Sequence, residues 1–205
     1  MAPVPAGSPG IAFNEQRLSD ASAPVMVIAR NTEVSQTGLE ADVAKVGLLD
    51  IASVTEEHVA LEGGNPEALR NGTTRNGSGG DETLNDGSTF RAYDKVSVLT
   101  FQLDIAKNPG GYDLAKILTF AGHKDSRASQ AYTVLVASIA DPAVFTKLAT
   151  AVLPCDGGAS ELRLCAKDAE VLGHHLAAVR FAFHDGPAGF NVYREINLVG
   201  QATGK

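Results

Sequence analysis

The sequence contains no tryptophan, only two cysteines, and few aromatic or charged residues, at 6% and 20%. Glycine and proline are abundant instead, with 21 and 9 residues, as is typical of a loop-rich β protein. No apolar run approaches the roughly 20 residues that a membrane-spanning helix requires. The 17 Lys and Arg residues against 24 Asp and Glu give a net charge of −7, which disfavours nucleic acid and anionic membranes as partners.

A length of 205 residues with 44% hydrophobic residues suits one sizeable domain. We expect an extended lead-in over residues 1–24, which are rich in Pro, Ala, Gly and Ser, a single domain over 25–200, and a tail over 201–205. The first residues lack the basic start and apolar run of a signal peptide. The protein is therefore either cytosolic or the mature form of an exported chain, and the second interpretation is favoured by the resemblance described below.

Cys155 and Cys165 flank a turn signal at residues 156–158. If the flanking segments formed one hairpin, the two thiols could face each other and form a disulfide, which would indicate an oxidising compartment. The alternative is two free thiols. A zinc site is disfavoured because no matching Cys or His pair lies nearby in the sequence.

Short β-branched or aromatic segments, separated by Gly, Pro, Asn and Asp turns, dominate the second half of the chain. Several alternate with period two, which is typical of strands with one buried face. The predicted strands are residues 25–29, 96–105, 114–121, 131–138, 144–152, 161–166, 176–184 and 192–199. Residues 38–62 fit helix or strand, with strands favoured, and 63–89 read as a long loop.

This pattern predicts an all-β fold, an antiparallel sandwich, because no repeated βα unit appears. We expect the apolar face of these strands to form the core. Its predicted members are Phe101, Leu103, Ile117, Val134, Val136, Val179, Phe181 and Ile196.

Three segments resemble motifs of galactose-binding-like, or discoidin-like, domains of secreted bacterial proteins. Residues 122–134 resemble W-x-D-S-R-A-S-Q-x-Y-T-V, with His123 in place of the tryptophan. Residues 84–90 resemble an L-x-D-G turn, and residues 192–200 resemble a final Y-R-E-I-D-V-x-G strand, preceded by 179–183. The resemblance covers roughly residues 84–200.

The resemblance implies a jelly-roll sandwich like family-32 carbohydrate-binding modules, mainly extracellular, that binds glycans through loops at one end. It also implies a structural calcium ion near the D-G turn, with Glu195 of the last strand as a ligand. Asp86, with Ser88 or Thr89, would supply the ligands from the turn. Calcium prefers several oxygen ligands at such bends. Without calcium, Asp86 would stabilise its own turn and Glu195 would be a paired surface carboxylate.

The polar stretch between two predicted strands carries candidate ligand-binding side chains, namely His123, Asp125, Arg127 and Gln130, with Arg75 from the Gly- and Asn-rich loop as a second wall. Their planar donors and acceptors suit sugar hydroxyls. The alternative is structural, with Arg127 and Asp125 paired to hold the loop. His174 and His175 are adjacent and so point to opposite faces of a strand, which disfavours a shared metal ion.

The favoured function is therefore a non-catalytic carbohydrate-binding module, with a glycan or polysaccharide as its partner. It would belong to a secreted or cell-surface protein, with other domains of a larger protein as possible partners. The alternative is a structural or adhesive domain of a cell-surface or matrix protein without a sugar site. No nucleophile elbow, HExxH, P-loop or CxxC motif is present, and a polysaccharide lyase or hydrolase is disfavoured.

Overall fold

The computed structural model describes residues 16–18, 25–32, 47–59, 65–72, 90–167 and 171–204, with the backbone alone for 16–18 and 26–32. The described residues form antiparallel strands joined by turns and two short 3-10 helices, η1 (Pro66–Arg70) and η3 (Ser126–Ala128). The strands are β1 (Gln16–Leu18), β2 (Val25–Thr32), β3 (Ile51–Glu57), β4 (Arg91–Tyr93), β5 (Val98–Leu103), β6 (Tyr112–His123), β7 (Gln130–Ser138), β8 (Asp141–Leu153), β9 (Gly158–Ala166), β10 (Gly173–Phe183) and β11 (Asn191–Ala202).

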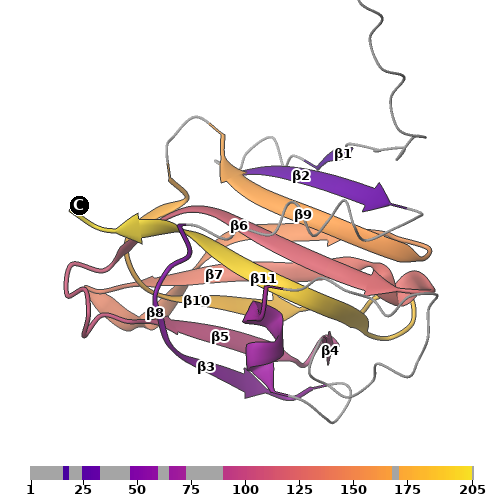
Figure 1. Ribbon diagram of the computed structural model, residues 1–205, viewed down its shortest axis with the longest axis horizontal. Coiled ribbons are helices and arrows are strands. Elements are labelled where there is room, and N and C mark those ends of the chain that lie inside the picture. Colours follow the sequence, from indigo (N-terminus) through magenta and orange to yellow (C-terminus); the bar gives the residue numbers. More distant parts are fainter. Residues whose placement is uncertain are drawn as a thin grey trace, which may run out of the picture.

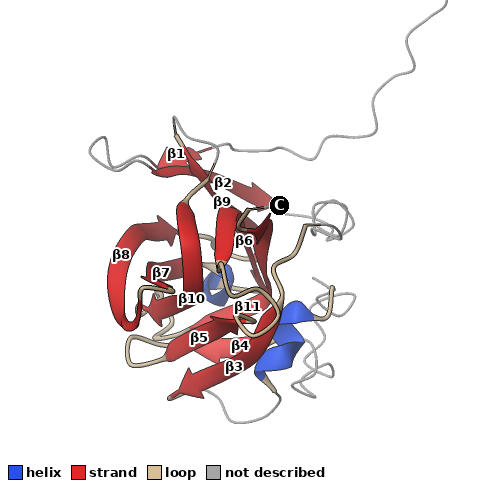
Figure 2. Ribbon diagram, turned by 90° about the vertical axis from the view of Figure 1, so that its left-hand side faces the viewer, coloured by secondary structure: helices blue, strands red, loops and turns tan. Residues whose placement is uncertain are grey.

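Strand pairing defines two layers that face each other (Figures 1 and 2). The first layer has the order β1-β2-β9-β6-β11-β4, and the second has the order β8-β7-β10-β5-β3. Short pairings between β10 and β6 at Gly173 and Leu176 join the two layers along one side. The predicted all-β antiparallel sandwich is confirmed.

The core lies between the layers, where alternate residues of the central strands are fully enclosed. Aromatic rings fill its centre, with Tyr93 stacked on Phe183 at 4.1 Å between ring centroids. Tyr132 meets the edges of Phe181 and Tyr193. Seven of the eight predicted core residues belong to this cluster, and Val136 packs against it while partly buried. The period-two pattern therefore identified the buried face correctly.

The amino-terminal half departs from the sequence expectations at several points. β1 lies inside the predicted lead-in and pairs with β2. In the segment 38–62, for which strands were favoured, the described part agrees with the expectation: Leu48 bridges Val199, and β3 follows as an edge strand beside β5. η1 lies inside the predicted long loop. Asn65 caps it by accepting the Glu67 N–H, and proline starts it without losing a needed donor. At the carboxyl end, β11 extends to Ala202, which is three residues beyond the predicted strand 192–199 and two residues into the predicted tail.

The predicted disulfide between Cys155 and Cys165 is wrong, since both cysteines are free thiols. Their flanking strands do not form a hairpin: β8 pairs with β7 in the second layer, whereas β9 pairs with β6 and β2 in the first. The turn between them crosses from one layer to the other. Cys165 lies seven residues along β9 from Gly158, which is roughly 23 Å of strand. Cys155 lies only three residues before Gly158, so the two thiols are too far apart for a disulfide.

Candidate functional site

The candidate ligand-binding residues cluster at the end of the sandwich where β6 finishes and β9 and β11 begin, on the right in Figure 1. His123 is the last residue of β6 and pairs with Gly158 at the start of β9. Asp125 caps η3 by accepting the Arg127 N–H at 3.0 Å. The sequence Asp-Ser-Arg therefore turns the chain sharply and places His123, Asp125 and Arg127 together.

Side-chain bonds preorganise this group. Asp125 shares a hydrogen bond with Nδ1 of His123 at 2.9 Å and accepts Nε and Nη2 of Arg127 at 2.9 and 2.6 Å. The bonds from Arg127 hold the pKa of Asp125 well below its usual range. Burial and then the Arg127 charge lower the pKa of His123, so its imidazole is neutral at pH 7. The pairing of Asp125 with Arg127 leaves part of all three side chains exposed, so it is compatible with contact to a ligand.

The turn between β8 and β9 forms a wall beside this group. Gly157 adopts a φ of +149° and lies so close to Lys124 that an added Cβ would sit 2.8 Å from its carbonyl oxygen. A glycine is therefore needed for the turn to approach the loop.

Two phenylalanines, which the sequence analysis missed, lie beside the cluster. Both are partly buried and stand next to guanidinium groups: Arg127 lies 5.7 Å from the centroid of Phe190, and Arg194 lies 5.1 Å from that of Phe90. Phe90 ends the segment that resembles the L-x-D-G turn, so its position in that motif was the available signal. Aromatic faces are therefore present despite the absence of tryptophan.

Arg194 reaches this end because β11 carries a bulge. The register with β6 shifts between Tyr193 and Glu195, which interrupts the alternation that would have turned Arg194 into the core. Its Nε donates to the Gly122 carbonyl at 3.1 Å, and its side chain is 8% exposed. Burial lowers the pKa of this guanidinium to about 10.

Gln130 does not join the cluster, although the sequence predicted it as a ligand-binding residue. It is fully buried at the start of β7. Its Nε2 donates to the Thr119 and Ser160 carbonyls, and its Oε1 accepts the Thr119 hydroxyl. The amide group thus satisfies buried polar groups, and the ligand-binding prediction for Gln130 is incorrect.

Of the predicted calcium ligands, the structure describes Glu195. Asp86 and Ser88, and the ligand-binding candidate Arg75, lie outside the described residues. Glu195 is 1% exposed, contrary to the surface-carboxylate alternative, and accepts the backbone N–H groups of Gly72 and Asn71. Burial raises its pKa to about 8. The nearby Arg70 charge also acts on this carboxylate, but no cation among the described residues is bonded to it. Carboxylate oxygens are ligands that calcium prefers.

Other features of the described chain are less suited to a ligand. His174 and His175 lie at the opposite end, near the Asp113 carboxylate and the Gly110 carbonyl. Within the described ranges, no three His, Cys, Asp or Glu side chains converge as a metal site. None of the helices described is long and apolar enough to span a membrane.

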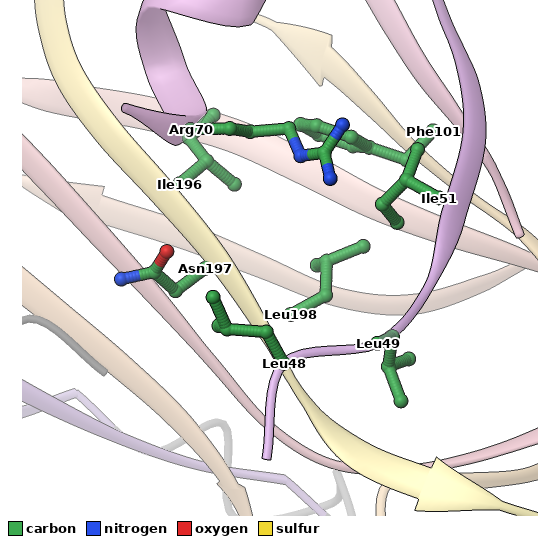
Figure 3. Close-up of a pocket in the computed structure, with 8 residues that line it drawn as sticks. All are labelled: Leu48, Leu49, Ile51, Arg70, Phe101, Ile196, Asn197 and Leu198. Atoms are coloured by element: carbon green, nitrogen blue, oxygen red, sulfur yellow. The ribbon is translucent and has the colours of Figure 1, made fainter. Parts of the chain in front are cut away.

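A pocket of about 310 Å³, including space open to solvent, lies between η1, the start of β3 and β11 (Figure 3). Arg70 reaches over it from η1, opposite Leu48 and Leu49. The lining is Leu48, Leu49, Ile51, Arg70, Phe101, Ile196, Asn197 and Leu198. This mostly aliphatic surface offers few partners for a hydroxyl-rich ligand.

No family model and no curated protein matches the chain. Solved structures similar to it include the CBM32 domain of AlyQ in complex with 4,5-unsaturated mannuronic acid. That pair has 15% identity and a TM-score of 0.46 over 74% of this chain and 96% of that one. A second is CpGH89CBM32-5 of Clostridium perfringens in complex with GalNAc-β-1,3-galactose, at 16% identity and a TM-score of 0.46, covering 72% and 93% of the two chains.

A third is the family 32 module of C. perfringens NanJ with galactose, at 13% identity and a TM-score of 0.47, covering 71% and 91%. These modules are of the class that the sequence motifs resemble. Because each TM-score is below 0.5, the ligands named for these structures remain properties of those proteins.

Proposed function

We propose that this chain is a non-catalytic carbohydrate-binding module whose sugar site is the end cluster of His123, Asp125 and Arg127, flanked by Arg194. The observation that carries the proposal is the meeting of fixed polar side chains with two partly exposed phenylalanine rings, Phe90 and Phe190. Planar donors and acceptors bind sugar hydroxyls, and an aromatic face packs on the apolar side of a pyranose.

The site is open, which sets the expected strength of binding. Sugar hydroxyls exchange bonds to water for bonds to protein, with a net gain of about 1 kcal/mol each. A few such bonds give dissociation constants of about micromolar to millimolar. Affinity for a polysaccharide would then come from repeated contacts along the polymer.

We further propose that a structural calcium ion is held by Glu195 together with Asp86 and Ser88. The buried carboxylate of Glu195, with its raised pKa, supports this assignment from the chain's own residues. A bound cation would neutralise that carboxylate and stabilise the last strand against the neighbouring turn. From the resemblance of residues 84–200 to discoidin-like domains, we also propose that the protein is secreted or lies at a bacterial cell surface, as one domain of a larger protein.

The experiment is a glycan-array screen in calcium and in chelator, comparing the wild type with His123→Ala. The proposal predicts retention on a defined subset of glycans, and loss of that retention in the variant at unchanged melting temperature. A matched control is His174→Ala at the opposite end, which should bind normally. Retention of no glycan by a folded wild type in calcium would reject the proposal.

The edge strand β8 supports the second candidate, a structural or adhesive domain. Among the described strands β8 pairs only with β7, and it exposes Val144 and Val152 by 53% and 51%. Unpaired edges can bind another strand, although Pro142, Lys147 and the irregular register of β8 restrain that pairing. Concentration-dependent self-association without glycan retention would favour this candidate.

A further inference from the structure

We propose that the sugar site binds uronic-acid residues, with the sugar carboxylate held by the guanidinium of Arg194. This inference rests on the proposed carbohydrate-binding function and specifies the charge class of the glycan.

Charge compensation within the site is incomplete. The two carboxylate oxygens of Asp125 are already bonded to Arg127 and His123. Arg194 has a carbonyl partner, Gly122, and the ring of Phe90 beside it, but no carboxylate among the described residues contacts it. One cation of the cluster, Arg127, is therefore paired with a carboxylate of the cluster, whereas the described part of the chain supplies no carboxylate partner for Arg194.

The guanidinium of Arg194 is positioned to act on a ligand. Arg194 is 8% exposed. Its two terminal nitrogens have no hydrogen-bond partner among the described residues, yet they are not fully enclosed. Some of the surface of these nitrogens is therefore reachable by solvent. The Arg194 charge also lowers the pKa of His123, which shows that it acts on the same cluster.

A carboxylate fits these requirements better than a hydroxyl. Two parallel N–H donors of a guanidinium match the two oxygens of a carboxylate, and the bond is strongest where water is partly excluded. Arg194 is only 8% exposed, so a carboxylate bonded to its guanidinium would be partly shielded from water. The neighbouring Phe90 ring would pack on the same sugar. A uronic acid combines both groups in one residue.

The test compares one polymer in two charge states. Affinity electrophoresis of the wild type is run in gels containing polygalacturonate or its methyl-esterified form, with dextran sulfate as a second polyanion. We expect binding at least about tenfold tighter to the free acid than to the ester, because the charged hydrogen bonds are lost on esterification. Dextran sulfate should bind more weakly than the free acid.

Variants assign the effect to the residue. Arg194→Gln should remove the preference for the free acid while weak binding to the ester remains. Lys147→Gln removes the same charge from β8 in the second layer and should keep the preference. If Arg194→Gln does not fold, the comparison of free acid with ester in the wild type still tests the preference for uronic acid.

The outcomes distinguish failure of the uronate assignment from failure of the proposed carbohydrate-binding function. Equal binding to acid and ester would overturn the uronate assignment and leave carbohydrate binding intact. Equal retardation by dextran sulfate and polygalacturonate would also overturn it, by indicating general polyanion binding. Absence of binding to every polysaccharide on the array would reject the proposed function itself.

Discussion

Arg91 and Glu56 form a bidentate ion pair that joins the two layers of the sandwich at one edge. Arg91 lies on β4 of the first layer and Glu56 on β3 of the second, with Nε of Arg91 2.9 Å from Oε1 of Glu56. The Tyr93 hydroxyl donates to the same carboxylate. The two charged side chains are only 5% and 11% exposed, so the pair is shielded from water.

Removing one partner of this pair should destabilise the fold strongly. Glu56→Gln removes the carboxylate that pairs with the buried Arg91 guanidinium, and we expect a loss of about 3–5 kcal/mol in the free energy of unfolding. Glu67→Gln is the matched control, because its pair with Arg70 is exposed and should contribute at most about 1 kcal/mol. Urea denaturation measures both changes, and similar losses in the two variants would contradict the account.

Glu195 should make stability depend on pH when calcium is removed. Its pKa is raised from 4.5 to about 8, so the folded state holds a proton that the unfolded state has released. Stability in chelator should therefore be highest below about pH 4.5 and fall towards pH 8, by at most about 1.4 kcal/mol per pH unit from this group.

Glu195→Gln cannot ionise and should lose this fall, and calcium should reduce it in the wild type because the ion replaces the proton. Denaturation curves at several pH values in chelator, with and without calcium, measure these effects. Identical pH profiles for the variant and the wild type would show that Glu195 is not the titrating group. A wild-type profile unaffected by calcium would reject the proposed metal site.

The free cysteines predict indifference to reducing agents. The melting temperature should be the same with and without reductant, and mass spectrometry should find no link between the two thiols. Cys165, which is partly exposed, should be alkylated faster than Cys155, which is buried and donates to the Gly157 carbonyl. A cross-linked peptide from non-reduced protein would contradict this picture.

The sequence predicted those features that depend on local alternation. Strands β5 to β11 lie close to their predicted ranges because the residues that face the core recur at every second position. Features that depend on long-range pairing were not accessible. The turn after Cys155 resembles a hairpin turn, but its two strands enter different layers and find other partners.

In the candidate site too, local contacts could be predicted from the sequence, whereas long-range contacts could not. The pairing of Asp125 with Arg127 could be predicted because the two residues are only two positions apart. The sequence pattern placed Arg194 on the apolar face, and only the register shift in β11 explains how it leaves that face. Gln130 belongs to the same motif as Asp125, but its partners Thr119 and Ser160 come from separate strands, so its burial could not be inferred from spacing.

The central claim, glycan binding at this end of the sandwich, is tested most directly by NMR titration of the ¹⁵N-labelled protein with an array-selected sugar. We predict that the largest shift changes fall on residues 122–130, 156–158 and 190–194, with little change around His174 at the opposite end. Changes centred on β8 or on the pocket near Leu48, or no changes at millimolar sugar, would contradict the claim.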